Sequence, residues 1–445
     1  MKRIFYVIAY AMLLLLPACD TNTTTTATKS SVAKLTSFYF AKNDSMPGLA
    51  KAVFTVEERK DTGLVWNKDS MLYGTRLDTV IPKFTFAATP GSAYLRTSDT
   101  TCALTGYDTL NFTKQPIYLT IRSSDGTNTK VYEIKPTVHQ VDPDLYSWLM
   151  LTDGIYPEDD SEQRVVELHD MFVMIKSNGF ELETFTSYDG IDWLDLGEPT
   201  GLPAGTRVRQ IISTGEELYY GEGTRLYTSE DGITWLPTDM NYPIITMLLY
   251  WNNEAWALID NNGQELAICD GYDLEPTGLR PTGDEFPVSD FATVCFQSAS
   301  TRERAMIIGG FAANGRSLNT RWNLEYSRHT PEHNGYRLEE YSIDRPTFKS
   351  LTGVSVIWYN NQLLMFGGVD KEMVYQGRDI LISNDEGLNW KAADSTKNQL
   401  PEVYQARQKQ SAIVRDNYIY LFGGQDSHMT YSDVYLGHLN SIDWE

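Results

Sequence analysis

The stretch that decides the fold is residues 355–368, S-V-I-W-Y-N-N-Q-L-L-M-F-G-G, with S-N-D-E-G-L-N-W following at 383–390. The same order returns at 411–424 as S-A-I-V-R-D-N-Y-I-Y-L-F-G-G, with L-N-S-I-D-W at 439–444. Each copy has an apolar run, a polar turn, a second apolar run ending in Gly-Gly, a loop and a Trp. This order predicts one four-stranded unit that occurs twice.

Degenerate copies of the unit precede these two. A Gly-Gly doublet also starts at Gly309, and the turn with its Trp occurs at 187–193 and 229–235. Periods of about 40–50 residues built from short strands are typical of propeller blades. We therefore predict six blades, whose inner strand pairs are Val165–Lys176, Arg209–Glu222, Ile245–Ile259, Ala292–Gly310, Gly353–Gly368 and Ser411–Gly424.

The motif residues have physical roles in such a blade. Gly-Gly lets the backbone leave the second strand at angles that a Cβ forbids. In the Ser-x-Asp-Gly turns, the Ser and Asp side chains can accept hydrogen bonds from backbone N–H groups. The Trp that follows is expected between neighbouring blades, where it buries a large apolar area.

Two known repeats resemble these motifs. The Gly-Gly doublets resemble kelch repeats, and residues 383–390 look like an Asp-box, the hairpin repeat of sialidase-type propellers. The predicted propeller spans residues 145–445. Trp148 stands 45 residues before Trp193, so residues 146–151 are expected to pair into the last blade, because an open ring would expose strand edges. The insert 321–344 either overhangs a face or extends a blade.

The first 18 residues are predicted to be a signal peptide, with Lys2-Arg3 before an apolar run too short to span a bilayer comfortably. Leu16-Pro17-Ala18-Cys19 resembles a bacterial lipobox, which implies cleavage before Cys19 and a lipid on that residue. Residues 19–31 form a Thr-rich tether. The resemblance implies a lipoprotein of the outer membrane, in which an outward-facing orientation is one option.

Residues 32–141 predict a separate all-β domain. Short strands are expected at 38–40, 51–56, 83–86, 117–121 and 130–134, with a hairpin turn at 124–127. Their number and spacing suggest an Ig-like sandwich. An Ig-like module, then V-H-Q-V-D-P-D, then a propeller, resembles uncharacterised lipoproteins of Bacteroidota.

Composition limits the function. The net charge is −22 and no basic patch stands out, which argues against a nucleic-acid partner. Cys102, Cys269 and Cys295 have no spacing typical of zinc or redox sites. A Cys269–Cys295 disulfide is one option, and small buried apolar residues are the preferred interpretation.

The resemblances also raise enzymatic alternatives. A sialidase needs an Arg cluster, an acid and a Tyr–Glu pair, and no Arg-Ile-Pro precedes the first blade; Asp344-Arg345-Pro346 is the nearest match. A copper oxidase of the galactose-oxidase kind needs two His, two Tyr and a Cys. His329 and His333 are four apart, but Pro331 argues against a helix that would face them together. We therefore expect no cofactor and no metal.

The interpretation that remains after the enzymatic alternatives is a binding surface. Loops after the second strands and between blades share one face of a propeller and supply aromatic and polar groups suited to sugar or peptide recognition. These candidate ligand-binding residues are Arg316, Tyr375, Arg378, Tyr404, Arg407, His428 and Tyr431. The predicted function is non-catalytic binding of a glycan or glycan-related partner. The alternatives are a carbohydrate-active glycosidase or oxidase, and a protein–protein scaffold at the cell envelope.

Overall fold

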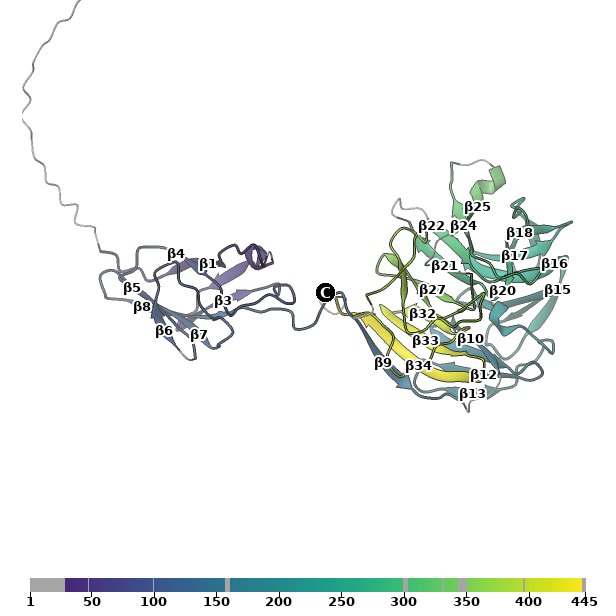
Figure 1. Ribbon diagram of the computed structural model, residues 1–445, viewed down its shortest axis with the longest axis horizontal. Coiled ribbons are helices and arrows are strands. Elements are labelled where there is room, and N and C mark those ends of the chain that lie inside the picture. The colour runs from purple at the N-terminus through teal and green to yellow at the C-terminus, as the bar shows by residue number, and fades with distance from the viewer. Residues whose placement is uncertain are drawn as a thin grey trace, which may run out of the picture. The chain divides into compact units, whose positions relative to one another are not determined.

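The structure is a computed structural model that describes residues 29–46, 48–98, 100–156, 161–298, 303–329, 332–342, 350–394 and 397–441. The chain forms two compact units that divide between Val141 and Asp142. Both units consist mainly of β-strands (Figure 1).

The N-terminal unit has two sheets. The smaller pairs β1 (Leu35–Phe40) with β4 (Pro82–Phe86). The larger has the order β2-β3-β8-β7-β5-β6, with bounds Phe54–Glu57, Thr62–Asn67, Thr129–Lys135, Ile117–Arg122, Ser92–Arg96 and Thr101–Ala103. One core fills the space between the sheets, where the Phe38 ring meets Phe54 edge-on at 4.7 Å. The unit is a β-sandwich, and its closer likeness to immunoglobulin domains stays a prediction.

The hairpin turn expected at 124–127 connects β7 and β8. The Asp125 carboxylate accepts hydrogen bonds from the Thr127 N–H at 2.9 Å and from the Ser123 and Thr127 hydroxyls. These bonds hold the carboxylate in its charged form and lower the pKa of Asp125.

The second unit is a β-propeller whose blades radiate from a ring of inner strands (Figure 1). Contacts run around the ring from β10 to β14, β16, β21, β27, β32 and back to β10. Four blades are ordinary four-stranded sheets. Blades are numbered along the chain by their inner strands. Blade 1 has β10 Glu162–Leu168, β11 Met171–Ser177, β12 Leu182–Ser187 and β13 Leu194–Gly197, and blade 4 has β21 Ala292–Gln297, β22 Glu303–Ile308, β24 Thr320–Tyr326 and β25 Tyr336–Ser342. Blade 5 has β27 Ser355–Tyr359, β28 Gln362–Phe366, β30 Leu381–Ser383 and β31 Lys391–Ala392, and blade 6 has β32 Ser411–Arg415, β33 Tyr418–Gln425, β34 Thr430–Leu439 and β9 Tyr146–Thr152.

Blades 2 and 3 share one continuous sheet in the order β14-β15-β16-β17-β18-β19. Its strands are Ile212–Ser213, Leu218–Ser229, Leu236–Trp251, Glu254–Asp260, Gln264–Cys269 and Leu274–Pro276. The first part of β16 pairs with β15, and the part from Ile244 onward pairs with β17. β16 is therefore the outer strand of blade 2 and the inner strand of blade 3. With this division, the described residues contain six blades, and the six predicted inner pairs coincide with them.

Short elements complete the propeller and the sandwich. Two loops after second strands pair back onto the entries of their blades, as β23 (Phe311–Ala312) with β20 (Pro287–Ser289) and β29 (Val369–Asp370) with β26 (Leu351–Thr352). The helical turns are η1 (Leu49–Lys51), η2 (Val208–Gln210) and η3 (Glu332–Gly335). No helix in the described part of the chain has the length and apolar character needed to cross a membrane.

Each junction between neighbouring blades holds its own apolar core, so six cores surround the ring. The Trp residues of the repeated turns lie in these cores, as predicted. Trp235 packs between blades 1 and 2, and Trp390 packs between blades 4 and 5. Burial of such large rings at the junctions favours closure of the ring over separate blades.

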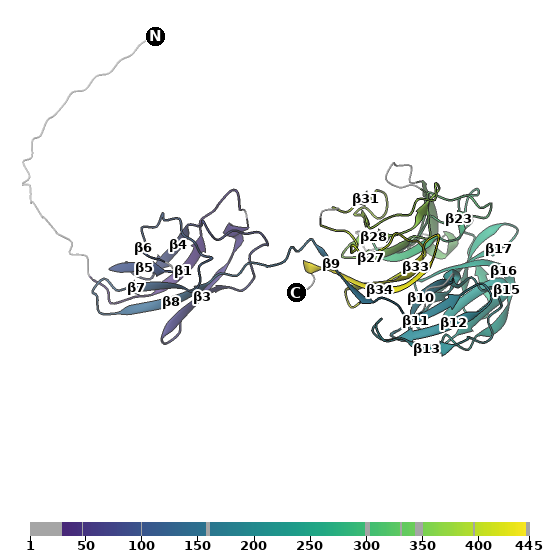
Figure 2. The ribbon, with the colours of Figure 1, turned by 60° about the horizontal axis from the view of Figure 1, so that its bottom comes forward.

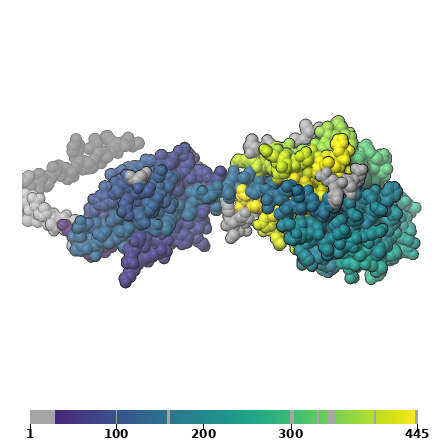
Figure 3. Space-filling model, turned by 90° about the horizontal axis from the view of Figure 1, so that it is seen from below, coloured from purple at the N-terminus to yellow at the C-terminus, as the bar shows by residue number. Residues whose placement is uncertain are grey.

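The ring is closed by β9, which comes from the start of the unit and pairs antiparallel with β34 from its end (Figure 2). Trp148 lies in the core between blades 5 and 6, edge-on to Phe366 at 5.9 Å. The predicted position of Trp148 in the final blade is therefore confirmed. Figure 3 shows the blue surface of the β9 region against the yellow surface of the C-terminal strands. Trp444 lies outside the described residues.

The repeated turns have one hydrogen-bond pattern. In the first, Asp189 Oδ1 accepts from the N–H groups of Ile191 at 2.8 Å and Asp192 at 3.0 Å, and Ser187 Oγ accepts from Gly190 N–H at 2.9 Å. The Trp193 indole N–H donates to the Gly190 carbonyl at 3.1 Å. The equivalent indole bonds of Trp235 and Trp390 measure 3.2 and 3.0 Å. The predicted accepting role of Ser and Asp is confirmed by these bonds.

The insert 321–344 extends a blade. Its described residues form most of β24 and all of β25, the outer two strands of blade 4. The alternative that it overhangs a face is therefore not what the described residues show, while Asp344-Arg345-Pro346 lies outside them.

Candidate functional site: the central channel of the propeller

The strands of a blade alternate in direction, which gives the propeller two different faces. The turns between first and second strands and between third and fourth strands share one face, which we call the turn face. Loops after the second strands and the connections between blades share the other, which we call the loop face. The predicted ligand-binding residues belong to the loop face.

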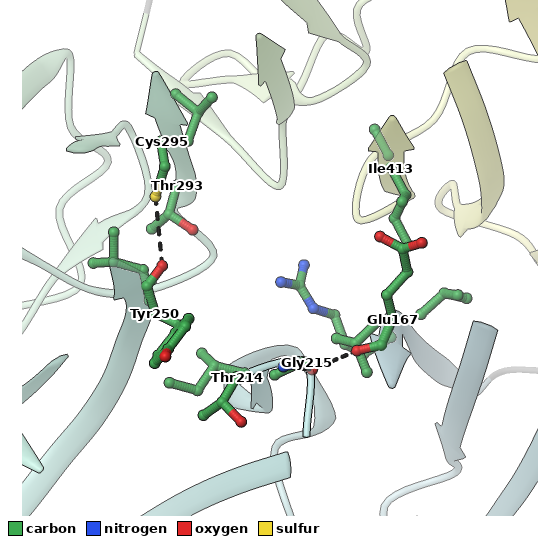
Figure 4. A pocket seen from close by; sticks show the side chains of 15 residues that line it. Glu167, Thr214, Gly215, Tyr250, Thr293, Cys295 and Ile413 are labelled. Atoms are coloured by element: carbon green, nitrogen blue, oxygen red, sulfur yellow. Dashed lines mark hydrogen bonds between the residues drawn. The ribbon is translucent and has the colours of Figure 1, made fainter. Parts of the chain in front are cut away.

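A cavity of about 360 Å³ lies inside the ring at the turn face. It is lined by parts of the inner strands of five blades, and we call it the outer chamber. Figure 4 shows Tyr250, Thr293 and Cys295 on one side, and Glu167 and Ile413 on the other. Thr214 and Gly215, from the first turn of blade 2, border the chamber between them.

A smaller cavity of about 70 Å³ lies farther along the channel toward the loop face, and we call it the inner chamber. Arg164 of β10 and Arg209 of η2 line it, together with Ser355 at the start of β27. Arg164, Ile212, Thr293 and Ala412 border both chambers. The Arg164 side chain therefore lies at the junction of the two.

Charged residues surround the loop-face end of the channel. The Lys409 ammonium lies 2.7 Å from Glu162 and 3.6 Å from Asp290. Burial opposes the charge on Lys409, but Asp290 and Glu162 outweigh it and raise the pKa of Lys409. The Arg209 guanidinium donates to the Lys409 carbonyl at 2.8 Å and the Gln410 carbonyl at 3.3 Å. Side chains and backbone from blades 1, 2, 4 and 6 are thereby connected.

The outer chamber contains two unusual titratable groups. Burial raises the pKa of Glu167, with Arg415 opposing the shift from 3.8 Å away. Cys295 is exposed as a residue, but desolvation of its sulfur inside the chamber raises the pKa of the thiol to about 12, which keeps it protonated. The Cys295 thiol donates to the Tyr250 carbonyl at 3.5 Å. Among the described lining residues, Glu167 is the single carboxylate, whereas glycosidases ordinarily use two.

Three of the predicted ligand-binding residues lie together but bind one another. The Arg407 guanidinium forms a two-point ion pair with Asp433, with the second contact at 3.0 Å. It also lies against the rings of Tyr404 at 4.4 Å and Tyr431 at 3.9 Å from their centroids. Arg407 is 1% exposed, so this cluster fills the junction beside blade 6 and offers a ligand little surface.

The other four predicted residues are separate from this cluster. Arg316 pairs with Glu285, and Arg378 donates from Nε to the Leu400 carbonyl at 2.9 Å. Tyr375 is half-buried beside the exposed Met373 and Val374, and His428 is exposed. These four lie in loops of the loop face, and no hydrogen bond or ion pair joins them to one another among the described residues.

The described cysteines Cys102, Cys269 and Cys295 are free thiols. The interpretation of small buried residues holds for Cys269, which is 3% exposed, but not for Cys295, which faces the outer chamber. His329 and His333 are exposed, and no group of three or more potential metal ligands occurs among the described residues. Cys19 lies outside the described residues.

Sequence reasoning missed Arg164 and Arg209. Both lie in or beside inner strands that were predicted correctly, so their membership of the ring was available from the repeat. A charged residue within an otherwise half-apolar inner strand was the signal that could have identified them. Which way the side chain points depends on the closure of the ring, which a sequence does not give.

A comparison with protein families agrees with this architecture, because the matching model over the second unit describes a β-propeller. No curated protein matches the chain. The solved structure of YjhT aligns with 63% of this chain and 95% of its own, at 12% sequence identity and a TM-score of 0.45. Residues 21–135 match the model described as "Domain of unknown function (DUF6242) N-terminal domain", and residues 142–445 match the "DUF6242 beta propeller domain". These two matches include both units, and the chain therefore belongs to the DUF6242 family.

Proposed function

We propose that this protein is a non-catalytic carbohydrate-binding lipoprotein of the outer membrane, which takes a glycan or glycan-related ligand on its propeller. The outer chamber carries the proposal. Its volume of about 360 Å³ suits a small sugar, and it lies where side chains from five blades converge. Tyr250 offers an aromatic surface and Thr293 offers a hydroxyl, a combination that suits a sugar's apolar faces and polar edges.

The resemblance to kelch and Asp-box repeats supports this proposal at the level of architecture. We also propose that a lipid on Cys19 and the Thr-rich tether hold the protein to the membrane, and that the N-terminal sandwich is an Ig-like spacer. The family match and the fold are compatible with these roles, but a fold does not by itself establish a function.

The loop face is a second candidate surface. There, the half-buried Tyr375 adjoins the exposed Met373 and Val374, which are 67% and 59% exposed. Aromatic and apolar groups of this kind can stack on a sugar or receive a peptide. Tyr404, Arg407 and Tyr431 add little to this surface, because they are buried and their polar groups already have partners.

The test is a glycan array with the purified full-length chain, run in parallel with chromogenic glycosides. We expect binding without turnover, weakened about tenfold or more by Tyr250→Ala, since an aromatic sugar contact is lost. Tyr272→Ala is the matched control, because Tyr272 is 82% exposed and does not line the chamber. Its binding should equal that of the unaltered protein.

Other outcomes separate the alternatives. Loss of binding in Tyr375→Ala, with Tyr250→Ala unaffected, would move the site to the loop face. Turnover of any glycoside would contradict the non-catalytic proposal and favour an enzyme acting on carbohydrate. Silence in both screens would favour a protein–protein scaffold.

A further inference from the structure

Arg164 has a charge that the described protein does not balance. No described residue forms a hydrogen bond or an ion pair with its guanidinium, and its Nε is buried without a partner. The Nε of Arg209 is in the same state. Arg164 keeps some accessible surface inside the channel, where it borders the small inner chamber, and burial is the largest influence on its charge.

The charges around the inner chamber do not sum to zero. Three cations, Arg164, Arg209 and Lys409, face two carboxylates, Glu162 and Asp290, which leaves one positive charge in excess. At the turn face, Arg415 lies 3.8 Å from Glu167 and 3.9 Å from Asp416, and Asp170 is also near Glu167, so the positive excess is confined to the inner chamber. The excess occurs inside a chain whose net charge is −22. A local positive charge against so acidic a background points to a specific local role.

Arginine cannot relieve this excess by losing its proton. Burial, and to a smaller extent the charge on Arg209, lowers the pKa of Arg164 to about 9, so the group stays cationic at neutral pH. An unpaired cation in a poorly solvated site is costly unless a counter-charge accompanies it. An anion from solution would supply that counter-charge.

We propose that the channel binds the oxyanion group of a small molecule, a carboxylate, phosphate or sulfate, at Arg164 between the two chambers. The guanidinium fork suits two-point binding of such a group. Thr293 borders both chambers, and its hydroxyl has no partner among the described residues, so it can donate a further hydrogen bond. The inner chamber is large enough for the anionic group, and the outer chamber would take the rest of the molecule.

This proposal stands on the charge balance of the channel and does not need the carbohydrate proposal to hold. Thermal unfolding of the full-length chain in sodium phosphate or sulfate, compared with chloride at matched ionic strength, tests it. We expect the oxyanions to raise the Tm by about 2–4 °C at saturation. Arg164→Gln should abolish this rise, and its Tm in chloride should be no lower than that of the unaltered protein, because an unpaired charge has been removed.

The matched control is Arg225→Gln, which removes a surface arginine paired with Asp239 and should leave the oxyanion response unchanged. If Arg164→Gln does not fold, Thr293→Val tests the same site and should weaken phosphate binding about tenfold by calorimetry. An equal Tm in phosphate, sulfate and chloride would overturn the proposal, as would an undiminished response in the channel variants.

Two further ligands distinguish the source of the oxyanion. Glucuronate and glucose differ at one carboxylate, so tighter binding of glucuronate, lost in Arg164→Gln, would identify an acidic sugar. A response to inorganic phosphate or sulfate with none to glucuronate would identify a free inorganic ion. Binding of glucose equal to that of glucuronate would support the carbohydrate proposal and contradict a role for Arg164 in carboxylate binding.

Discussion

Gly367, the first glycine of the doublet after β28, has a backbone φ of +60°. A Cβ at this position would lie 2.6 Å from the Arg407 carbonyl oxygen. Two independent constraints, the left-handed backbone and the close approach of the next blade, therefore act on one residue. Gly309, at the same point of the preceding blade, has a φ of +66° and would likewise place a Cβ against the backbone of the next blade, at Leu351.

We expect Gly367→Ala to lower the free energy of unfolding by about 2–4 kcal/mol, the sum of backbone strain and a steric conflict with a carbonyl that cannot move freely. Chemical denaturation of the full-length chain measures this as a lower midpoint. Gly377→Ala is the control, since a Cβ there would meet nothing within 4 Å, and its midpoint should be almost unchanged. Equal midpoints for the two variants would contradict the argument.

Residue types were easier to predict than residue roles. Tyr404, Arg407 and Tyr431 were correctly placed beside the loop face, but the sequence does not reveal that Asp433 and the two rings already occupy the guanidinium. Arg164 is the opposite case, because its guanidinium has no hydrogen-bond or ion-pair partner among the described residues. Both facts depend on distances between blades that are remote in sequence.

Secondary-structure elements show how pairing closes the ring. β9 is the outermost strand of blade 6, and Trp148 on it packs over Gly437 of β34, where a Cβ would collide with the indole ring. The next residue, Leu149, is 61% exposed. The two neighbours on one strand therefore differ in burial, as pleating requires.

Trp148→Ala should lower the free energy of unfolding by about 3 kcal/mol, because it leaves a cavity in the core that joins blades 5 and 6. The same substitution at Leu149 is the control and should change it by less than about 0.5 kcal/mol. Thermal or chemical unfolding compares them. A Trp148→Ala protein as stable as Leu149→Ala would show that β9 adds little to ring closure.

Elements with local signals were the predictable ones. The Gly-Gly doublets and Asp turns predicted the blade positions, because each motif fixes the backbone conformation of its own few residues. The continuous β16 was not anticipated, since a strand that serves two blades lacks the loop that would mark its change of role. In the sandwich, β3, β5 and β6 were missed, and β3 pairs in parallel with the distant β8.

For the whole molecule, the sequence indicated the all-β class, the six blades and the closing strand, each of which follows from the repeat. It did not indicate that a channel with excess positive charge lies inside an acidic chain, because that balance combines residues from several blades. Anchoring at Cys19 is a property of the whole molecule that the described residues leave as a proposal.

Cys19→Ala should abolish incorporation of radiolabelled fatty acid and move the protein from the membrane to the soluble fraction, because lipid chains would supply its membrane affinity. Fractionation of cells that express each form measures this. Cys102→Ala is a matched cysteine control in the sandwich and should leave labelling and location unchanged. Membrane attachment that survives Cys19→Ala would refute the lipid anchor.

The pairing of β9 with β34 also determines when the ring can close during biosynthesis. The Ser147 and Asn440 side chains hydrogen-bond at 2.7 Å across 293 residues of sequence. At about 5–20 residues per second, β9 would emerge from the ribosome roughly 15–60 s before its partner. Blade 6 is thus the last to assemble, and any product that stops before β34 leaves β33 and β9 without the strand that joins them. Such an unfinished ring would be a natural target for chaperones and proteases, which makes complete synthesis a condition for a stable propeller.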